Sequence, residues 1–97
     1  MTQAPAPTTN AHDLTGRICL VTGAAGGIGR GIAARLTAEG AVVVVADLDA
    51  EAARRTAEEL GGQSLAVHVD IADRASVDAM TAQVMDRFGR IDVLVNN

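Results

Sequence analysis

The chain of 97 residues contains no Lys, no Tyr and no Trp, and its single aromatic residue is Phe88. All eight basic residues are therefore Arg. Without Lys the chain cannot form a Walker-type phosphate loop, which requires a Gly-Lys-Ser/Thr sequence. Without Lys and Tyr it cannot supply a Tyr/Lys pair for proton transfer. The lack of aromatic side chains also argues against a base-stacking platform for single-stranded nucleic acid.

Positive charge is scarce as well, since the net charge is −4 and the isoelectric point is about 4.9. A basic face for nucleic acid or for anionic lipid is therefore not expected. No apolar run approaches the ~18–20 residues of a membrane span. No basic residue precedes Arg17, so a secretory signal is not predicted. The single cysteine, Cys19, excludes an internal disulfide and a multi-cysteine metal site, and favours a cytoplasmic protein without a metal site.

The order of polar and apolar segments predicts a disordered N-terminal extension followed by one domain. Residues 1–13 are mostly Ala, Pro, Thr and other polar residues, a composition typical of disorder. From residue 14 to 97 four short apolar runs recur, at 18–22, 41–46, 65–69 and 91–95. Such β-branched runs favour strands that are buried on both faces, as in parallel sheets.

Helical patterns separate the four expected strands. The apolar side chains at helical spacing are Ile28, Ile32 and Leu36, then Ala53, Ala57 and Leu60, then Val77, Met80, Val84 and Phe88. Asp49 and Asp73 precede the second and third patterns and are candidate N-caps. Gly40 and Gly89 follow the first and third patterns, where a glycine typically ends a helix. The alternation predicts three consecutive βαβ units.

Connection handedness then predicts the topology. Right-handed crossovers place the first two helices on one face if the first three strands step in one direction. A fourth strand on the other side of the first strand puts the third helix on the opposite face. The prediction is an α/β fold that forms the N-terminal half of a doubly wound, Rossmann-like parallel sheet with strand order 3-2-1-4. Ligands of such sheets bind at the carboxyl ends of the strands, where the order reverses.

A glycine-rich loop follows the first strand, with Gly23, Gly27 and Gly29 in the pattern G-x-x-x-G-x-G. Glycines permit a tight turn and a close approach of the backbone to a ligand. The helix that begins here presents free N–H groups, which suit a pyrophosphate. The same loop could instead serve packing alone, since a strict G-x-G-x-x-G is absent.

Acidic residues end the second and third strands. Asp47 lies 24 residues after Gly23, near the spacing expected for an acid that binds the adenosine ribose and repels a 2′-phosphate. Asp47 could also be an ordinary strand-end acid or a helix cap, although Asp49 is the better cap. Asp70 could bind the adenine amino group, with Ile71 beside the ring, or could be an ordinary strand-end acid.

Together the glycine loop after Thr22, the strand-end Asp47, the Asp70-Ile71 pair and the Asn96-Asn97 pair resemble the short-chain dehydrogenase/reductase family. Because Gly26 is also a glycine, the loop also satisfies the pattern T-G-x-x-G-x-x-G of the family's extended branch. The Leu94–Asn97 segment is similar to the start of the Asn-Asn-Ala-Gly segment of the main, compact branch. The resemblance implies that this segment borders the cofactor ribose and pairs with Thr22.

The resemblance implies the cofactor-binding part of an oxidoreductase that transfers hydride between NAD(H) and a small-molecule alcohol or carbonyl. The implied cofactor site comprises Gly23, Gly27, Ile28, Gly29, Asp47, Leu48, Asp70, Ile71 and Asn96. Asp47 favours NAD over NADP. In the family the catalytic Asn, Ser and Tyr-x-x-x-Lys residues follow this region, so we expect no catalytic residue here and no activity from this chain alone. The full-length protein is expected to be a homo-oligomer. The alternative is a non-catalytic dinucleotide-binding or sensor module.

Overall fold

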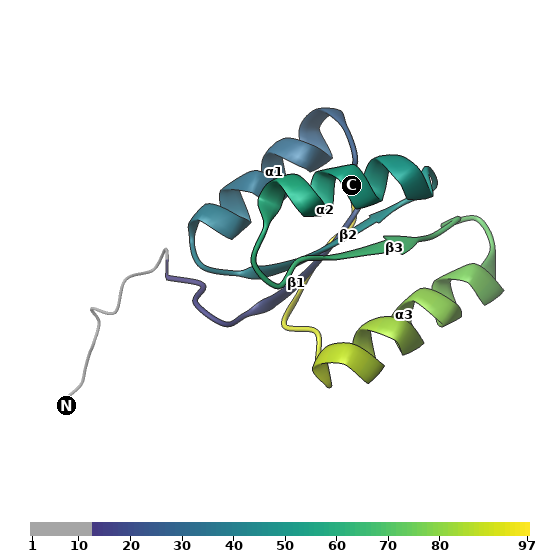
Figure 1. Ribbon diagram of the computed structural model, residues 1–97. Helices are drawn as coiled ribbons and strands as arrows, with labels where there is room; N and C mark the ends of the chain where they lie inside the picture. Colours follow the sequence, from purple (N-terminus) through teal and green to yellow (C-terminus); the bar gives the residue numbers. More distant parts are fainter. Residues whose placement is uncertain (1–12) are drawn as a thin grey trace.

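The computed structural model describes residues 13–97, so all of the expected extension except Asp13 lies outside the described residues. Strands and helices alternate along the chain (Figure 1). The elements are β1 (Ile18–Thr22), α1 (Gly27–Ala38), β2 (Val42–Asp47), α2 (Ala50–Leu60), β3 (Leu65–His68), α3 (Arg74–Phe88) and β4 (Val93–Val95). No helix among these described residues has the length and apolar character needed to cross a membrane.

The four strands form one parallel sheet in the order β3-β2-β1-β4, which confirms the predicted topology. Helices α1 and α2 cover one face of the sheet and α3 covers the other (Figure 1). The order reverses between β1 and β4. The carboxyl ends of all four strands therefore lie along one edge, where the predicted site residues follow them.

Two apolar cores lie on the two faces of the sheet, and neighbouring apolar residues of β1, β2 and β3 belong to different cores. Val43 and Val45 of β2 pack beneath α1 and α2, whereas Val44 packs against the α3 side. Cys19 of β1 is fully buried in the first core. Burial raises the pKa of its thiol, and the nearby Asp92 carboxylate adds to this effect. Burial on both faces explains the unbroken β-branched runs.

Helix α1 packs against the sheet through two small, buried residues and two larger, partly buried ones. Gly29 and Ala33 are buried, and Ile32 and Leu36 are partly buried beside them. Ile28 continues the helical spacing of Ile32 and Leu36 but is 78% exposed, because it lies in the first turn of the helix, at the carboxyl ends of the strands. The small side chains allow the helix to approach β1 closely.

Aspartate caps begin two of the three helices, as the sequence predicts. Asp49 accepts a hydrogen bond from the Ala52 N–H at 3.0 Å, and Asp73 accepts one from the Ala75 N–H at 3.0 Å. Gly89 ends α3 in the left-handed conformation, with φ of 76°. Helix α1 differs, because its N-cap is Gly26 and no side chain caps it.

Strand β4 begins at Val93, two residues later than the expected start at residue 91. The Asp92 Oδ2 accepts hydrogen bonds from the Ile18 N–H at 2.8 Å and from Arg90 Nε at 2.9 Å. Arg90 Nη2 also donates to the Gly16 carbonyl at 2.8 Å. The Asp92 carboxylate accepts the hydrogen bond that a strand carbonyl would otherwise accept from the Ile18 N–H. Regular pairing of β4 with β1 therefore begins at Val93, one residue after Asp92. Strand β2 is shifted in the same direction, since it begins at Val42 rather than at residue 41 and ends at Asp47.

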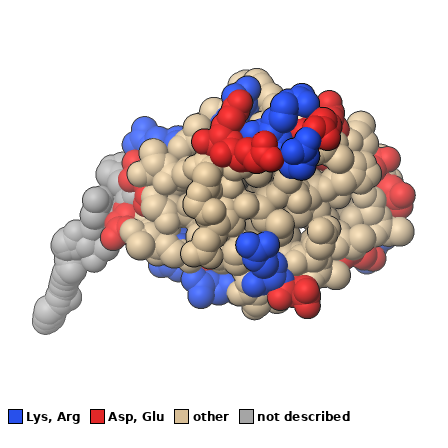
Figure 2. Space-filling view, viewed as in Figure 1, with Lys and Arg blue, Asp and Glu red and all other residues tan. Residues whose placement is uncertain are grey.

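Charged side chains on the visible face gather mainly over the α1 and α2 layer, where both signs are interleaved (Figure 2). Arg30 of α1 pairs with Glu59 of α2, and Arg54 pairs with Glu51 and Glu58 of its own helix. Because each of these arginines has an acidic partner, this layer presents no uniformly basic surface.

Candidate functional site

The glycine loop leaves β1 at Thr22 and turns at once into α1. Gly23 has a φ of 63°, in the left-handed region that glycine adopts without strain. Two successive N–H groups of the loop bond to the end of β2. The Ala24 N–H donates to the Ala46 carbonyl at 3.2 Å, and the Ala25 N–H donates to Asp47 Oδ2 at 3.0 Å. The loop is thus attached to the neighbouring strand before the helix begins.

Two of the predicted glycines are required by close packing within the protein. A Cβ atom added at Gly29 would lie 2.1 Å from the Gly23 carbonyl oxygen and 2.6 Å from Asn97 Nδ2. One added at Gly23 would lie 2.9 Å from the same Asn97 nitrogen. The Asn97 amide donates to the Gly23 carbonyl at 3.1 Å. The glycines therefore bring the start of α1, the loop and the end of β4 together.

The other two loop glycines face open space. A Cβ atom added at Gly26 or Gly27 would meet nothing within 4 Å. The first turn of α1 carries no acidic side chain, and no side chain caps its N–H groups. A helix N-terminus with free N–H groups and a positive dipole end favours an anion. This open start of α1 fits the pyrophosphate that the sequence predicts there.

A hollow of about 240 Å³ lies at the carboxyl ends of the strands, beside the loop. Its lining comprises Gly23, Asp47, Leu48, Val69, Asp70, Ile71 and Asn97. Leu48 and Ile71 are more than half exposed, an unusual state for large apolar side chains that ligand burial would relieve. The two side chains give the hollow apolar walls, and the two carboxylates give it hydrogen-bond acceptors.

Both carboxylates of the hollow bond to nearby backbone. Asp47 Oδ1 accepts from the Asp49 N–H at 3.0 Å, while its Oδ2 accepts from Ala25 as described above. Asp70 Oδ1 accepts from the Ala72 N–H at 3.0 Å. These bonds fix the direction of each carboxylate, and a carboxylate has further lone pairs for a ligand.

The end of β4 is attached to the end of β1 through Thr22. The Thr22 hydroxyl lies 3.4 Å from both the Val95 carbonyl and Asn96 Oδ1, and it accepts from the Asn97 N–H at 3.2 Å. Asn96 lines a second hollow of about 220 Å³, on the α3 side, together with Thr22, Ile71 and Leu94. The two hollows share Ile71 as a lining residue.

The structure thus brings most of the predicted site residues together at the carboxyl ends of the strands. Gly23, Asp47, Leu48, Asp70 and Ile71 line the first hollow, and Asn96 lines the second. Gly29 packs on Gly23, while Gly27 and Ile28 face solvent at the start of α1.

Asn97 was not among the predicted site residues, yet it lines the first hollow and bonds to the loop. Its place directly after Asn96 was the available signal. No group of three or more His, Cys, Asp and Glu side chains that could hold a metal occurs between residues 13 and 97.

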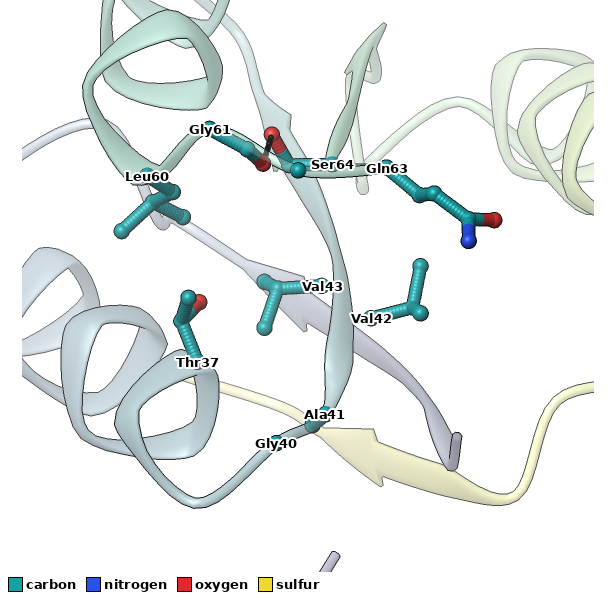
Figure 3. Close-up of a pocket in the computed structure, with 10 residues that line it drawn as sticks. Thr37, Gly40, Ala41, Val42, Val43, Leu60, Gly61, Gln63 and Ser64 are labelled. Carbon is teal, nitrogen blue, oxygen red and sulfur yellow. Dashed lines mark hydrogen bonds between the residues drawn. The ribbon is translucent and has the colours of Figure 1, made fainter. Parts of the chain in front are cut away.

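A larger hollow of about 280 Å³ lies at the opposite edge of the sheet, at the start of β2 (Figure 3). Thr37, Leu60 and Ser64 are among its lining residues, none of which is charged. The Thr37 hydroxyl bonds to the Ala33 carbonyl, and the Ser64 hydroxyl bonds to the Ala57 and Gly61 carbonyls. Its hydroxyls already have protein partners, so the smaller hollow beside the loop is the better candidate site.

Several known proteins are similar to this chain. A sequence model described as short chain dehydrogenase matches residues 17–97. Sorbitol dehydrogenase from Cereibacter sphaeroides is 49% identical over 84 residues, which cover 87% of this chain and 33% of that protein. Galactitol 2-dehydrogenase from Agrobacterium fabrum is 45% identical over 84 residues, with the same two coverages. The chain therefore spans about one third of the length of these relatives.

Solved structures show the same fold. A hydroxysteroid dehydrogenase from Escherichia coli superimposes with a TM-score of 0.84 at 38% identity, over 89% of this chain and 36% of that one. A 3-ketoacyl-(acyl-carrier-protein) reductase from Brucella melitensis, solved in complex with NADH, gives a TM-score of 0.82 at 43% identity. That alignment covers 84% of this chain and 34% of the reductase.

Proposed function

Because the chain belongs to the short-chain dehydrogenase family, we propose that it forms the cofactor-binding part of an oxidoreductase that transfers hydride between NAD(H) and an alcohol or carbonyl substrate. The observation that carries this proposal is the open, uncapped start of α1 beside the Asp47 carboxylate. The names of the sugar-alcohol dehydrogenase relatives and the NADH complex of the reductase support it.

The residues at the carboxyl ends of the strands fit a nicotinamide dinucleotide that is bound in one orientation. The N–H groups of Gly27, Ile28 and Gly29 would hold the pyrophosphate, and Asp47 would accept hydrogen bonds from the adenosine ribose. Leu48, Asp70 and Ile71 would enclose the adenine, with apolar contact on the ring and a carboxylate for its amino group. Asn96 would border the second ribose. When bound, the nicotinamide ring supplies the hydride chemistry.

We propose NAD rather than NADP as the preferred cofactor. A 2′-phosphate beside Asp47 would bring two negative charges together, and no Arg lies between Thr22 and Ile28 to compensate. A hydrogen bond to a charged group contributes about 1.5–3 kcal/mol, which corresponds to about 10–150-fold in affinity. We therefore expect the full-length protein to bind NADH at least about tenfold more tightly than NADPH.

Fluorescence titration of both cofactors tests this preference. Asp47→Ala should reduce the ratio of the two dissociation constants toward one. Asp49→Asn is the matched control, because it removes a neighbouring negative charge and keeps an acceptor for the Ala52 N–H. The control should keep the preference of the unaltered protein. Tighter binding of NADPH by the unaltered protein would overturn the assignment.

A further inference from the structure

The Asp47 carboxylate bonds to two different segments before any ligand is considered. Its Oδ2 accepts from the Ala25 N–H of the glycine loop, and its Oδ1 accepts from the Asp49 N–H at the start of α2, both at 3.0 Å. Asp47 itself is the last residue of β2 and is only partly exposed. A single side chain thus connects a strand, a loop and the cap of a helix.

Apart from Asp47, the loop is held at its start, where Ala24 is buried in the core and the Asn97 amide donates to the Gly23 carbonyl. Among the described residues, Asp47 is the only side chain that accepts a hydrogen bond from an N–H group of residues 24–28. Gly26 and Gly27 have no side chains to pack, and open space surrounds them. The remaining attachment to β2 is one backbone bond, from Ala24 to the Ala46 carbonyl. Removing the carboxylate would leave residues 25–28, which follow the buried Ala24, with no hydrogen bond to β2.

We propose that Asp47 is a positioning residue that holds the glycine loop in the conformation that receives the pyrophosphate. The inference rests on the proposed function and adds a second role to the ribose contact. The two roles are compatible, because each carboxylate oxygen can accept more than one hydrogen bond. A consequence follows for cofactor preference. Substitutions that relieve the repulsion of a 2′-phosphate also release the loop, so they weaken the phosphate contacts of both cofactors.

Hydrogen exchange in the nucleotide-free, full-length protein tests the loop directly. In Asp47→Ala the peptide that carries residues 24–29 should exchange several-fold faster than in the unaltered protein. Asp47→Asn keeps only one acceptor oxygen for the N–H groups of Ala25 and Asp49, so its protection should lie between that of Asp47→Ala and that of the unaltered protein. Asp49→Ala, which removes a neighbouring carboxylate that does not touch the loop, should leave this peptide unchanged. If Asp47→Ala does not fold, Asp47→Ser replaces it, since its hydroxyl is one bond shorter and does not reach the loop.

Binding of reduced nicotinamide mononucleotide separates the loop role from the ribose role. This ligand carries a phosphate but no adenosine, so it has no group that reaches Asp47. We expect Asp47→Ala to weaken its binding about three- to tenfold, as expected for the loss of an ordered hydrogen bond. Asp49→Asn should bind this ligand as the unaltered protein does, and the affinity of Asp47→Asn should lie between those of Asp47→Ala and the unaltered protein.

The two measurements distinguish the possible failures. Unchanged exchange of the loop peptide in Asp47→Ala would overturn the positioning role, even if NADH binds as proposed. Unchanged binding of the mononucleotide in that variant would do the same. If the unaltered protein binds no nicotinamide nucleotide, the proposed function fails, while the exchange experiment still decides whether Asp47 holds the loop.

Discussion

Glycines two residues apart at the start of α1 have opposite roles. The backbone of Gly29 packs against the Gly23 carbonyl, where an added Cβ atom would lie at 2.1 Å. Gly31 lies on the same helix, and an added Cβ atom there would meet nothing within 4 Å. The first glycine is needed for packing, whereas the second costs the helix some stability, because glycine is a poor helix former.

The same substitution at these two positions should therefore change stability in opposite directions. We expect Gly29→Ala to lower the free energy of unfolding by about 1–3 kcal/mol, because the loop and Asn97 must move to admit the methyl group. Gly31→Ala should raise it by up to about 1 kcal/mol. Urea denaturation of both variants measures the difference. Equal effects of the two substitutions would contradict the packing role of Gly29.

At the scale of elements, the short strand β4 depends on a side chain at its start. Asp92 joins the start of β4 to β1 through Ile18, and Arg90 continues this contact to Gly16. The hydrogen bond from the Ile18 N–H, followed by that from Arg90, lowers the pKa of the Asp92 carboxyl below its ordinary value. Because β4 carries Asn96 and Asn97 to the loop, this contact at the amino end of the strand supports the site at its carboxyl end.

The lowered pKa predicts how stability depends on pH. A carboxyl whose pKa is lower in the folded than in the unfolded state stabilises the fold above its unfolded pKa, near 3.8, and loses that contribution as the pH falls toward and through its folded pKa. We expect Asp92→Asn to be less stable than the unaltered protein at pH 7, with the gap narrowing below about pH 4. The pKa of Asp13 is also lowered, by hydrogen bonds from Thr15, but that group is common to both proteins. Urea midpoints at pH 7 and pH 3 test this, and a gap that is constant with pH would contradict it.

Elements with strong local signals could be predicted from the sequence. The valine run of β2 and the caps Asp49 and Asp73 are local features, and crossover handedness then determined the strand order. The family resemblance implied the pairing of Thr22 with the end of β4, which the structure contains, but other side-chain contacts between distant residues could not be predicted. The spacing identified Ile32 and Leu36, which pack against the core, but it also included Ile28, which is exposed. It did not show that Gly29 and Ala33 are the buried residues of the helix. Likewise, no local pattern shows that Asp92 bonds to Ile18 or that Asp47 bonds to Ala25.

The site residues also divide into those that the sequence indicated and those that only the three-dimensional structure shows. The glycine spacing and the strand-end acids identified the edge of the sheet where a ligand would bind, because parallel strands end together. The amide contact of Asn97 with Gly23 depends on how β4 meets β1 in three dimensions. The family resemblance therefore named Asn96 but did not show the contact of Asn97 with Gly23.

At the scale of the whole molecule, we predict that the 97-residue chain alone does not protonate a substrate in the site. It has no Tyr and no Lys, and its described histidine, His68, lies on the outer strand β3. Hydride transfer to a carbonyl leaves an alkoxide that requires a proton, and the loss of a general acid costs about 10²–10⁴-fold in rate. We expect the isolated chain to show no turnover of NADH with a panel of ketones. Gly31→Ala and Gly29→Val serve as controls, and turnover that survives in the first but disappears in the second would contradict this expectation.

The sheet of the 97-residue chain also has an unpaired edge at β4. Leu94 at the centre of this strand is 61% exposed, and α3 is the only helix among residues 13–97 on that face of the sheet. An exposed apolar edge strand offers unpaired backbone groups to another copy. We expect the isolated chain to self-associate at micromolar concentration and Leu94→Lys to shift it toward monomer, since a charged side chain opposes edge pairing. Sedimentation velocity over a concentration series measures this. Ile28→Lys is the matched control, because Ile28 is equally apolar and 78% exposed but lies away from the edge, on α1. If both variants dissociate the chain equally, general surface charge rather than the β4 edge controls association.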